Sequence, residues 1–144
     1  MNPKSAIQKG KLLENWIVER LHLSELDIRA ARNPGSGNGK NKGDICNDLN
    51  ICFEAKNTAR PNFNEALKQA NREALGTQIP VVVWHMPNTP LEDSKVVIDW
   101  HYFETLLLKI KNSTPAYQNP DRTAGWALRN LQAAIKKVEK ELNI

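Results

Sequence analysis

The sequence predicts an α/β (α+β) fold, in which a mixed central β-sheet is flanked by helices and followed by a C-terminal helix. Three observations lead to this fold class. Segments with helical and strand-like hydrophobic periods alternate along the chain, as in domains that pack helices on a sheet. Residues 79–86 are almost continuously apolar, which is typical of a central strand covered on both faces. Residues 44–56 form two strand-like runs around a short polar turn, which predicts a hairpin.

A long helix opens the predicted fold and ends near Leu23. Leu13, Ile17 and Leu21 recur at helical spacing, and Ser5 with Gln8 has the pattern of a capping box. Asn2-Pro3 offers an alternative start one turn earlier. The elements expected next are a turn and a strand within 24–32, where Leu26, Ile28 and Ala30 alternate, a glycine-rich loop at 33–43, and the hairpin at 44–56 with its turn at 48–50.

The second half is expected to alternate helices with strands. Asn62 is predicted to cap a helix, with Glu65 at the capping-box position and Gly76 at its end. The buried stripe of this helix is expected to be Phe63, Leu67, Ala70 and Ala74. The remaining expected elements are strands at 79–86 and 95–99, a helix at 100–111 with Phe103, Leu106, Leu107 and Ile110 facing inward, a polar segment at 112–122 and a helix at 123–143. Residues 1–111 are therefore predicted to form the core, and 112–144 a linker with an amphipathic helix.

Composition sets broad limits on function. The chain has 144 residues, enough for one domain with a sizeable core, and its net charge of +4 with a pI near 9.1 mildly favours an anionic partner. No apolar run approaches the length that spans a membrane, and the N-terminus lacks the apolar core of a signal peptide. We therefore expect a cytoplasmic protein without membrane partners.

Cysteine and histidine do not form a metal-binding pattern in this sequence. Cys46 and Cys52 are the only cysteines, and neither has His or Cys neighbours at the spacing of a zinc site. In the predicted hairpin they face each other, and in a reducing cytoplasm we expect small buried residues rather than a disulfide. His85 closes an apolar strand and is expected to be structural.

The hairpin brings a set of charged side chains together. Glu54 and Lys56 share one face of a strand because side chains alternate, and a turn at 48–50 sets Asp44 opposite Glu54. Two close carboxylates repel each other, and a divalent cation relieves that repulsion. Such a cation activates water, and Lys56 is placed to orient that water or to stabilise charge on a phosphate. These groups are the ones that phosphodiester hydrolysis requires.

Asp44 followed after nine intervening residues by Glu54-Ala55-Lys56 resembles the signature of the PD-(D/E)XK nuclease superfamily, with Gly43 where that pattern often has proline. Further residues are similar to archaeal and phage-type Holliday-junction resolvases: Lys9-Gly10 with Glu14 on the first helix, Arg32, Gly35-Ser36-Gly37 and Asn57. The resemblance covers roughly the first half of the chain well and the rest in outline.

The resemblance implies a restriction-endonuclease-like core and a metal-dependent DNA endonuclease acting on branched DNA. Asp44, Glu54 and the carbonyl of Ala55 would bind Mg²⁺ or Mn²⁺, and Lys56 would activate water. Glu14 and Gln69 are the further candidate catalytic residues that it implies. From the residues alone, Glu14 is equally a solvated helix residue and Gln69 an exposed amide.

Four residues near the predicted site are candidates for binding DNA phosphates: Arg32, Ser36, Lys40 and Lys42. Arg32 is alternatively a surface charge, and the loop at 33–43 alternatively a plain linker. The loop runs directly into Asp44, which favours its role in binding.

Two rival functions stay open at this point. A nuclease of the same fold could act on duplex, nicked or single-stranded DNA, because the motif reports chemistry rather than substrate. A non-catalytic DNA-binding module is the other rival, although it would be expected to lose part of the Asp44, Glu54 and Lys56 set.

A homodimer is expected, because resolving a four-way junction takes two matched cuts and each chain has one predicted site. The apolar residues of the last helix step by three and four, the spacing of a coiled-coil seam: Leu128, Leu131, Ile135, Val138 and Leu142. This seam is predicted to pack either on a dimer partner or on its own domain.

Overall fold

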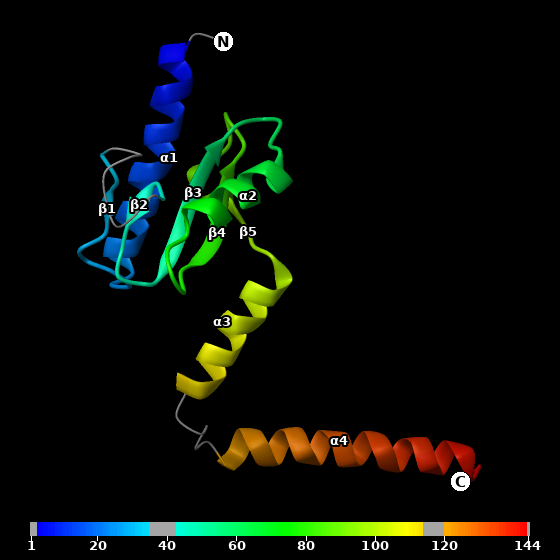
Figure 1. Ribbon diagram of the computed structural model, residues 1–144. Helices are drawn as coiled ribbons and strands as arrows, with labels where there is room; N and C mark the ends of the chain where they lie inside the picture. The colour runs from blue at the N-terminus through cyan, green and yellow to red at the C-terminus, as the bar shows by residue number, and fades with distance from the viewer. Residues whose placement is uncertain (1–2, 35–42, 114–119, 144) are drawn as a thin grey trace. The chain divides into compact units, whose positions relative to one another are not determined.

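A computed structural model describes residues 3–34, 43–113 and 120–143 of the chain. The fold is α+β, with helices and a mixed sheet, as the sequence predicts (Figure 1). Its elements are α1 (Pro3–Leu23), β1 (Ala31–Arg32), β2 (Ile45–Cys46), β3 (Ile51–Asn57), α2 (Phe63–Glu73), β4 (Ile79–His85), a 3₁₀ turn η1 (Leu91–Asp93), β5 (Lys95–Val97), α3 (Trp100–Ser113) and α4 (Pro120–Glu141). Helix α1 thus begins at the earlier of the two predicted starts.

The chain divides into two compact units, Met1–Thr105 and Leu106–Ile144. The first unit holds a two-stranded sheet, β1-β2, and a three-stranded sheet, β3-β4-β5. It is the part that positions the candidate site. Over the ranges that the structure describes, no helix has both the length and the apolar composition needed to cross a membrane.

The main sheet has three strands in the order β3-β4-β5. Strands β3 and β4 are parallel, with Glu54 beside Val82, and α2 connects them. Strand β5 is antiparallel to β4, with Val97 beside Val82. The central strand β4 is buried along nearly its whole length, because it is covered on both faces as its apolar sequence predicts.

Helices α1 and α2 cover opposite faces of β3. The Asn57 side chain donates from Nδ2 to the Lys9 carbonyl of α1, at 2.8 Å. Lys56, one residue earlier, donates from Nζ to Oε1 of Gln69 on α2, at 3.2 Å. Since successive side chains of a strand point to opposite faces, one face of β3 meets each helix (Figure 1).

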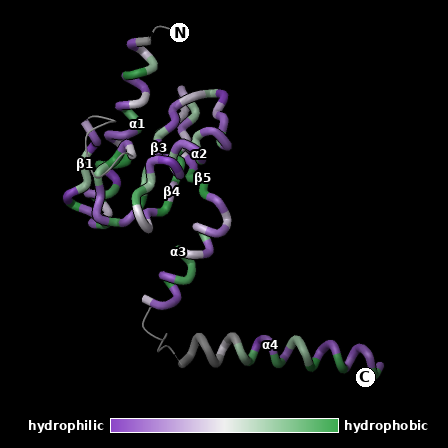
Figure 2. The backbone as a smooth tube through the Cα atoms, viewed as in Figure 1, coloured by the Kyte–Doolittle hydropathy of each residue, from purple (hydrophilic) through white to green (hydrophobic). Residues whose placement is uncertain are grey.

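The hydrophobic core lies where these helices meet the sheet. Its buried apolar residues are Leu13, Ile17, Leu21, Ala30, Ile45, Cys52, Ala66, Ala70, Ile79, Val81, Val82 and Val83. Figure 2 shows a different pattern in α4, where hydrophobic and hydrophilic residues alternate with the helical repeat.

Helix α2 begins as predicted and ends earlier than predicted. Asn62 is its N-cap and accepts a hydrogen bond from the Glu65 amide at 3.1 Å. The helix ends at Glu73, because Ala74 turns to extended backbone, whereas Gly76 has φ +57° two residues later. The buried stripe is centred on Ala66 and Ala70, whereas Phe63 and Leu67 are half-buried.

The strand predicted within 24–32 is wrong except for its last two residues. Leu26 and Ile28 are 62% and 73% exposed, so their alternation does not mark a buried face. Asp27 explains the difference, because its carboxylate accepts hydrogen bonds from the Arg29 and Asp48 amides. Such bonds favour a turn over a ladder.

The predicted hairpin is also partly wrong. Strand β2 pairs with β1 in a separate two-stranded sheet, with Ile45 beside Arg32. It is joined to β3 by the bond from the Asp44 amide to the Phe53 carbonyl at 2.8 Å and by the side chain of Asn47. The predicted turn does form, because the Asn47 side chain accepts from the Leu49 amide and donates to the carbonyls on both sides of the turn.

Two expectations about burial are wrong as well. Cys46 is half-exposed rather than buried, whereas Cys52 is buried, and both are free thiols. Helix α3 has no buried residue, and Phe103 and Ile110 are 39% and 61% exposed. An apolar stripe identifies an amphipathic helix but does not reveal what covers it.

Gly43 lies so close to β3 that an added side chain would be tightly packed. A Cβ atom here would lie 3.0 Å from both the Cys52 Sγ and the Phe53 carbonyl oxygen.

We therefore predict that Gly43→Ala lowers the free energy of unfolding by about 1–3 kcal/mol, as overpacking does, measured by urea denaturation. Gly10→Ala is the control, because the nearest atom to its Cβ is Glu14 Oε1 at 3.9 Å. In a helix interior this control should gain about 0.5–1 kcal/mol. Unchanged stability of Gly43→Ala would contradict the tight packing.

Candidate active site

The candidate site is built around Glu54 and Lys56 of β3. Both point to the α2 face of the sheet, and Lys56 Nζ lies 2.6 Å from Glu54 Oε1. Glu54 is only 2% exposed, whereas the Lys56 side chain is 33% exposed. The pair therefore has a buried acidic end and a basic end that solvent or a ligand can reach.

Asp44 joins this pair although it precedes β2. Its Oδ2 accepts a hydrogen bond from the Ala55 amide at 2.7 Å, in the middle of the Glu54-Ala55-Lys56 triplet. The close approach of Gly43 to β3 makes this contact possible. The structure thus brings the aspartate and the triplet together, as predicted, through fewer backbone bonds than a hairpin would provide.

The electrostatics of the site disfavour two ionised carboxylates. Burial raises the pKa of Glu54 to about 7, and the charge of Asp44 adds to this effect while Lys56 opposes it. Burial also raises the pKa of Asp44, whereas its hydrogen bond from the Ala55 amide acts in the opposite direction. The charge of Lys56 therefore does not offset the burial and mutual repulsion of Asp44 and Glu54.

Helix α2 adds two polar residues to the site. Gln69 Oε1 accepts from Lys56, and Gln69 Nε2 donates to Glu73 Oε1 at 3.2 Å. Gln69 was predicted from the sequence, whereas Glu73 was not. The signal for Glu73 was its place four residues after Gln69, on the same face of the helix. Its charge acts on both Asp44 and Glu54.

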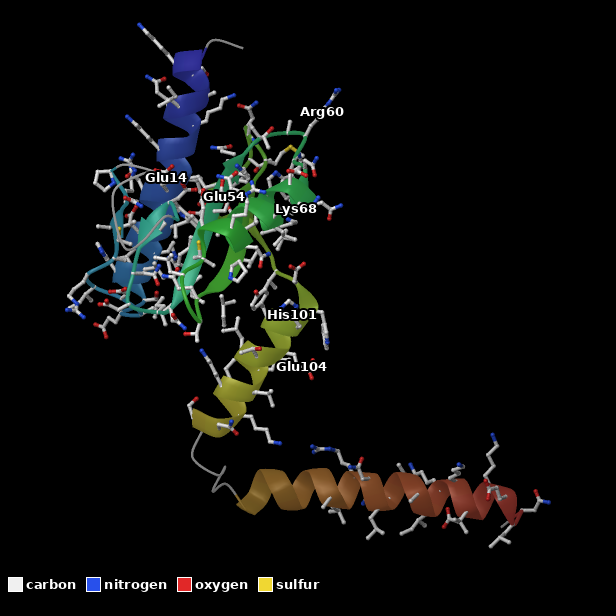
Figure 3. The ribbon with its side chains drawn as sticks, in the orientation of Figure 1. Glu14, Glu54, Arg60, Lys68, His101 and Glu104 are labelled. Carbon is white, nitrogen blue, oxygen red and sulfur yellow. The ribbon has the colours of Figure 1, made fainter. Side chains whose placement is uncertain are left out.

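Glu14 and Arg32 form an ion pair at the edge of the site. Arg32 Nε donates to Glu14 Oε2 at 2.8 Å, and both side chains are partly exposed. Glu14 comes from α1 and Glu54 from β3, as labelled in Figure 3, and the charge of Glu14 acts on Asp44. Glu14 is therefore close enough to influence the site, with one carboxylate oxygen bonded to Arg32.

The donor set fits a hard divalent cation. Glu54 Oε2 is buried and has no hydrogen-bond partner, while Oε1 is bonded to Lys56. An unpartnered buried carboxylate oxygen is costly unless a cation or proton satisfies it. No three His, Cys, Asp or Glu side chains in the described ranges are gathered to hold an ion. The protein would thus supply Asp44, Glu54 and the Ala55 carbonyl, which suits Mg²⁺ because this ion retains several waters.

Of the predicted phosphate-binding residues, only Arg32 lies within the described residues. Ser36, Lys40 and Lys42 fall in 35–42, outside them. Arg32 uses Nε for Glu14, and its guanidinium has further N–H donors. Two other cations, Arg60 before α2 and Lys68 on α2, are exposed and labelled in Figure 3.

The neighbouring Cys52 and His85 are structural. Burial raises the pKa of the Cys52 thiol to about 11, so the thiol stays protonated and is a poor nucleophile or metal ligand. His85 is buried and hydrogen-bonds through Nδ1 to Asn57 Oδ1 and through Nε2 to the Thr89 carbonyl. This agrees with its predicted structural role.

Comparisons of the chain with models of protein families, with curated proteins and with solved structures found no match. The functional interpretation therefore depends on the chemistry and geometry of the site itself.

The raised pKa of Glu54 predicts how stability depends on pH. A carboxyl whose pKa is higher in the folded state keeps its proton longer than in the unfolded state, so stability falls as pH rises from about 4.5 to about 7. Without metal, Glu54→Gln should remove this loss, which is about 3 kcal/mol at most. The variant should therefore be more stable than wild type at pH 8 and similar to it near pH 4.5.

Thermal unfolding of metal-free protein across this pH range measures the difference. Glu65→Gln is the matched control, because the Glu65 side chain is 61% exposed. Added Mg²⁺ should narrow the gap at pH 8 by stabilising wild type more than Glu54→Gln. A constant difference between wild type and Glu54→Gln at all pH values would contradict the assignment.

Proposed function

We propose that this chain is a metal-dependent DNA endonuclease that hydrolyses phosphodiester bonds. One observation carries the proposal: a buried Glu54 carboxylate with one unpartnered oxygen lies beside Asp44 and is paired with Lys56. A structural ion pair would not need a second, half-buried carboxylate that raises the pKa of the first. A restriction-endonuclease-like arrangement, which the Asp44 and Glu54-Ala55-Lys56 motif resembles, gives these residues complementary roles.

Asp44 and Glu54, with the Ala55 carbonyl, would hold Mg²⁺ or Mn²⁺. The bound ion would supply Lewis-acid stabilisation of the phosphate and lower the pKa of a water. Glu54 Oε2 is the free ligand atom, while Oε1 keeps Lys56 in place. The Ala55 amide orients Asp44 through its bond to Oδ2.

Lys56 would contact the reacting groups. Its ammonium has three N–H donors, of which Glu54 and Gln69 accept two. The third is available to the attacking water or to a phosphate oxygen. A fixed positive charge aimed at the developing negative charge stabilises the transition state more than the ground state.

Branched DNA is the proposed substrate, on the strength of the resemblance to Holliday-junction resolvases. Arg32 and the loop residues Ser36, Lys40 and Lys42 would hold phosphates around the cleaved bond. The net charge of +4 supports a polyanionic partner.

Labelled four-way junction, duplex, nicked and single-stranded DNA, each with and without Mg²⁺, test this function. Wild type should cut the junction only with metal. Asp44→Asn and Glu54→Gln should abolish cleavage while keeping DNA binding, because less negative charge faces the phosphates. Lys56→Ala should slow cleavage by about 10²–10³-fold, as the loss of one preorganised group does.

Glu65→Gln makes the same chemical change as Glu54→Gln at an exposed position and should cleave like wild type. Wild-type rates in either carboxylate variant would contradict the proposed site. Preference for duplex, nicked or single-stranded DNA would favour the same-fold alternative. Binding without cleavage of any substrate, with Mg²⁺ or Mn²⁺, would favour a non-catalytic DNA-binding module.

A homodimer is the second part of the proposal, because two matched cuts need two sites. The apolar residues of α4 and of the turn after it are each between 48% and 63% exposed: Leu128, Leu131, Ile135, Val138 and Leu142. Their alternating steps of three and four residues are those of a coiled-coil seam, which a second copy of the same helix complements.

Light scattering across dilutions tests this dimer. Wild type should be dimeric at micromolar concentration, and Leu131→Asp with Ile135→Asp should be monomeric because two buried charges would oppose pairing. Gln132→Asp with Lys136→Asp is the matched control, one residue further along and off the seam. A wild-type monomer that still cuts junctions in pairs would contradict the dimer.

A further inference from the structure

Three side chains form a hydrogen-bond chain that runs from the site to the end of α2. Lys56 Nζ donates to Gln69 Oε1 at 3.2 Å, and Gln69 Nε2 donates to Glu73 Oε1 at 3.2 Å. Each link runs from a donor to an acceptor, so the chain has one polarity from Lys56 to Glu73. It begins at the group that faces the proposed reaction.

The chemistry of the two end groups fixes the amide between them. An ammonium only donates, so Lys56 requires the oxygen end of Gln69. An ionised carboxylate only accepts, so Glu73 requires the nitrogen end. A flipped amide would set two donors against each other at one end and two acceptors at the other. Only one orientation of Gln69 therefore satisfies both neighbours.

Glu73 stands where helix electrostatics do not favour it. It is the last residue of α2, and a negative charge at a helix C-terminus is destabilising. It also lies close enough to Asp44 and Glu54 for its charge to raise the pKa of each carboxyl. A residue that is unfavourable on both counts is better explained by its contact with Gln69.

We propose that Glu73 is a positioning residue that orients the Gln69 amide, which together with Glu54 fixes the direction of Lys56. With two of its N–H donors held, the ammonium directs its third toward the water or phosphate. This inference rests on the proposed nuclease function for its effect on rate, whereas the amide orientation stands independently of it.

Two substitutions separate positioning from simple charge. Glu73→Gln removes the charge but keeps an oxygen that accepts from Gln69 Nε2. Glu73→Ala removes both the charge and the acceptor. If the acceptor matters, Glu73→Gln resembles wild type and Glu73→Ala does not. If only the charge matters, the two variants behave alike.

The Gln69 side-chain amide resonances in a ¹⁵N–¹H correlation spectrum of the metal-free full chain report the orientation. Comparison with Gln69→Ala assigns them. In Glu73→Ala they should move toward the positions of a solvated amide, and in Glu73→Gln they should stay near wild type. Glu65→Ala is the control, an exposed carboxylate on the same helix, and should leave them unchanged. Unchanged Gln69 resonances in Glu73→Ala, or equal changes in both Glu73 variants, would overturn the proposal.

Cleavage of the four-way junction with Mg²⁺ gives the second readout. Glu73→Ala should lower kcat by about 10–100-fold with little change in KM, the usual effect of losing a group that orients a site residue. Glu73→Gln should recover most of that loss. Equal kcat values for Glu73→Ala and wild type would overturn the positioning of Lys56. If wild type cuts no DNA, the nuclease function fails, and the amide resonances alone decide the orientation.

Discussion

The buried carboxylate of Glu54 is the constraint on which the rest of the site depends. Moving an ion of this kind out of water costs several kcal/mol after relaxation, and a well-placed partner offsets only part of that cost. Lys56 satisfies one oxygen at 2.6 Å, whereas Oε2 has no partner and Asp44 adds a like charge. Hydration would stabilise this oxygen, so the packing that keeps water away from it maintains the cost. Stability is therefore reduced at the place where the proposed metal would bind.

A polar network joins the surrounding elements on the opposite face of β3. Asn57 donates to the Lys9 carbonyl of α1 and bonds through Oδ1 to His85 of β4, which in turn contacts Thr89. One side chain thus ties α1, β3 and β4 together, and it lies one residue from Lys56. Because Glu14 lies on α1 and its charge acts on Asp44, the bond between Asn57 and α1 helps to hold α1, and with it Glu14, next to the site.

The hydrophobic periods were enough to predict the α+β class and the central strand, and alternation along β3 predicts that Glu54 and Lys56 share a face. The approach of Asp44 depends instead on its bond from the Ala55 amide and on the close contact of Gly43 with β3. Local hydrogen bonds explain the missing part of the first predicted strand. Asp27 bonds to amides at Arg29 and Asp48 and converts a strand-like alternation into a turn. Glu73 was missed because its role depends on the face of α2 that meets β3. A helix pattern gives that face only once its partner is known.

The balance of charge in the site supports the proposed metal-dependent chemistry more than binding of a polyanion alone. Among the described residues, the charges of Glu14 and Glu73 act on Asp44, and those of Asp44 and Glu73 act on Glu54. These four carboxylates are paired with two cations, Arg32 and Lys56. A surface that only binds a polyanion gains affinity from Lys and Arg and loses it from each nearby carboxylate. A formal charge of −2 beside a phosphate is therefore unfavourable until a divalent cation neutralises it. Binding of phosphate would then be coupled to binding of metal, because the cation offsets the repulsion between the carboxylates and the phosphate.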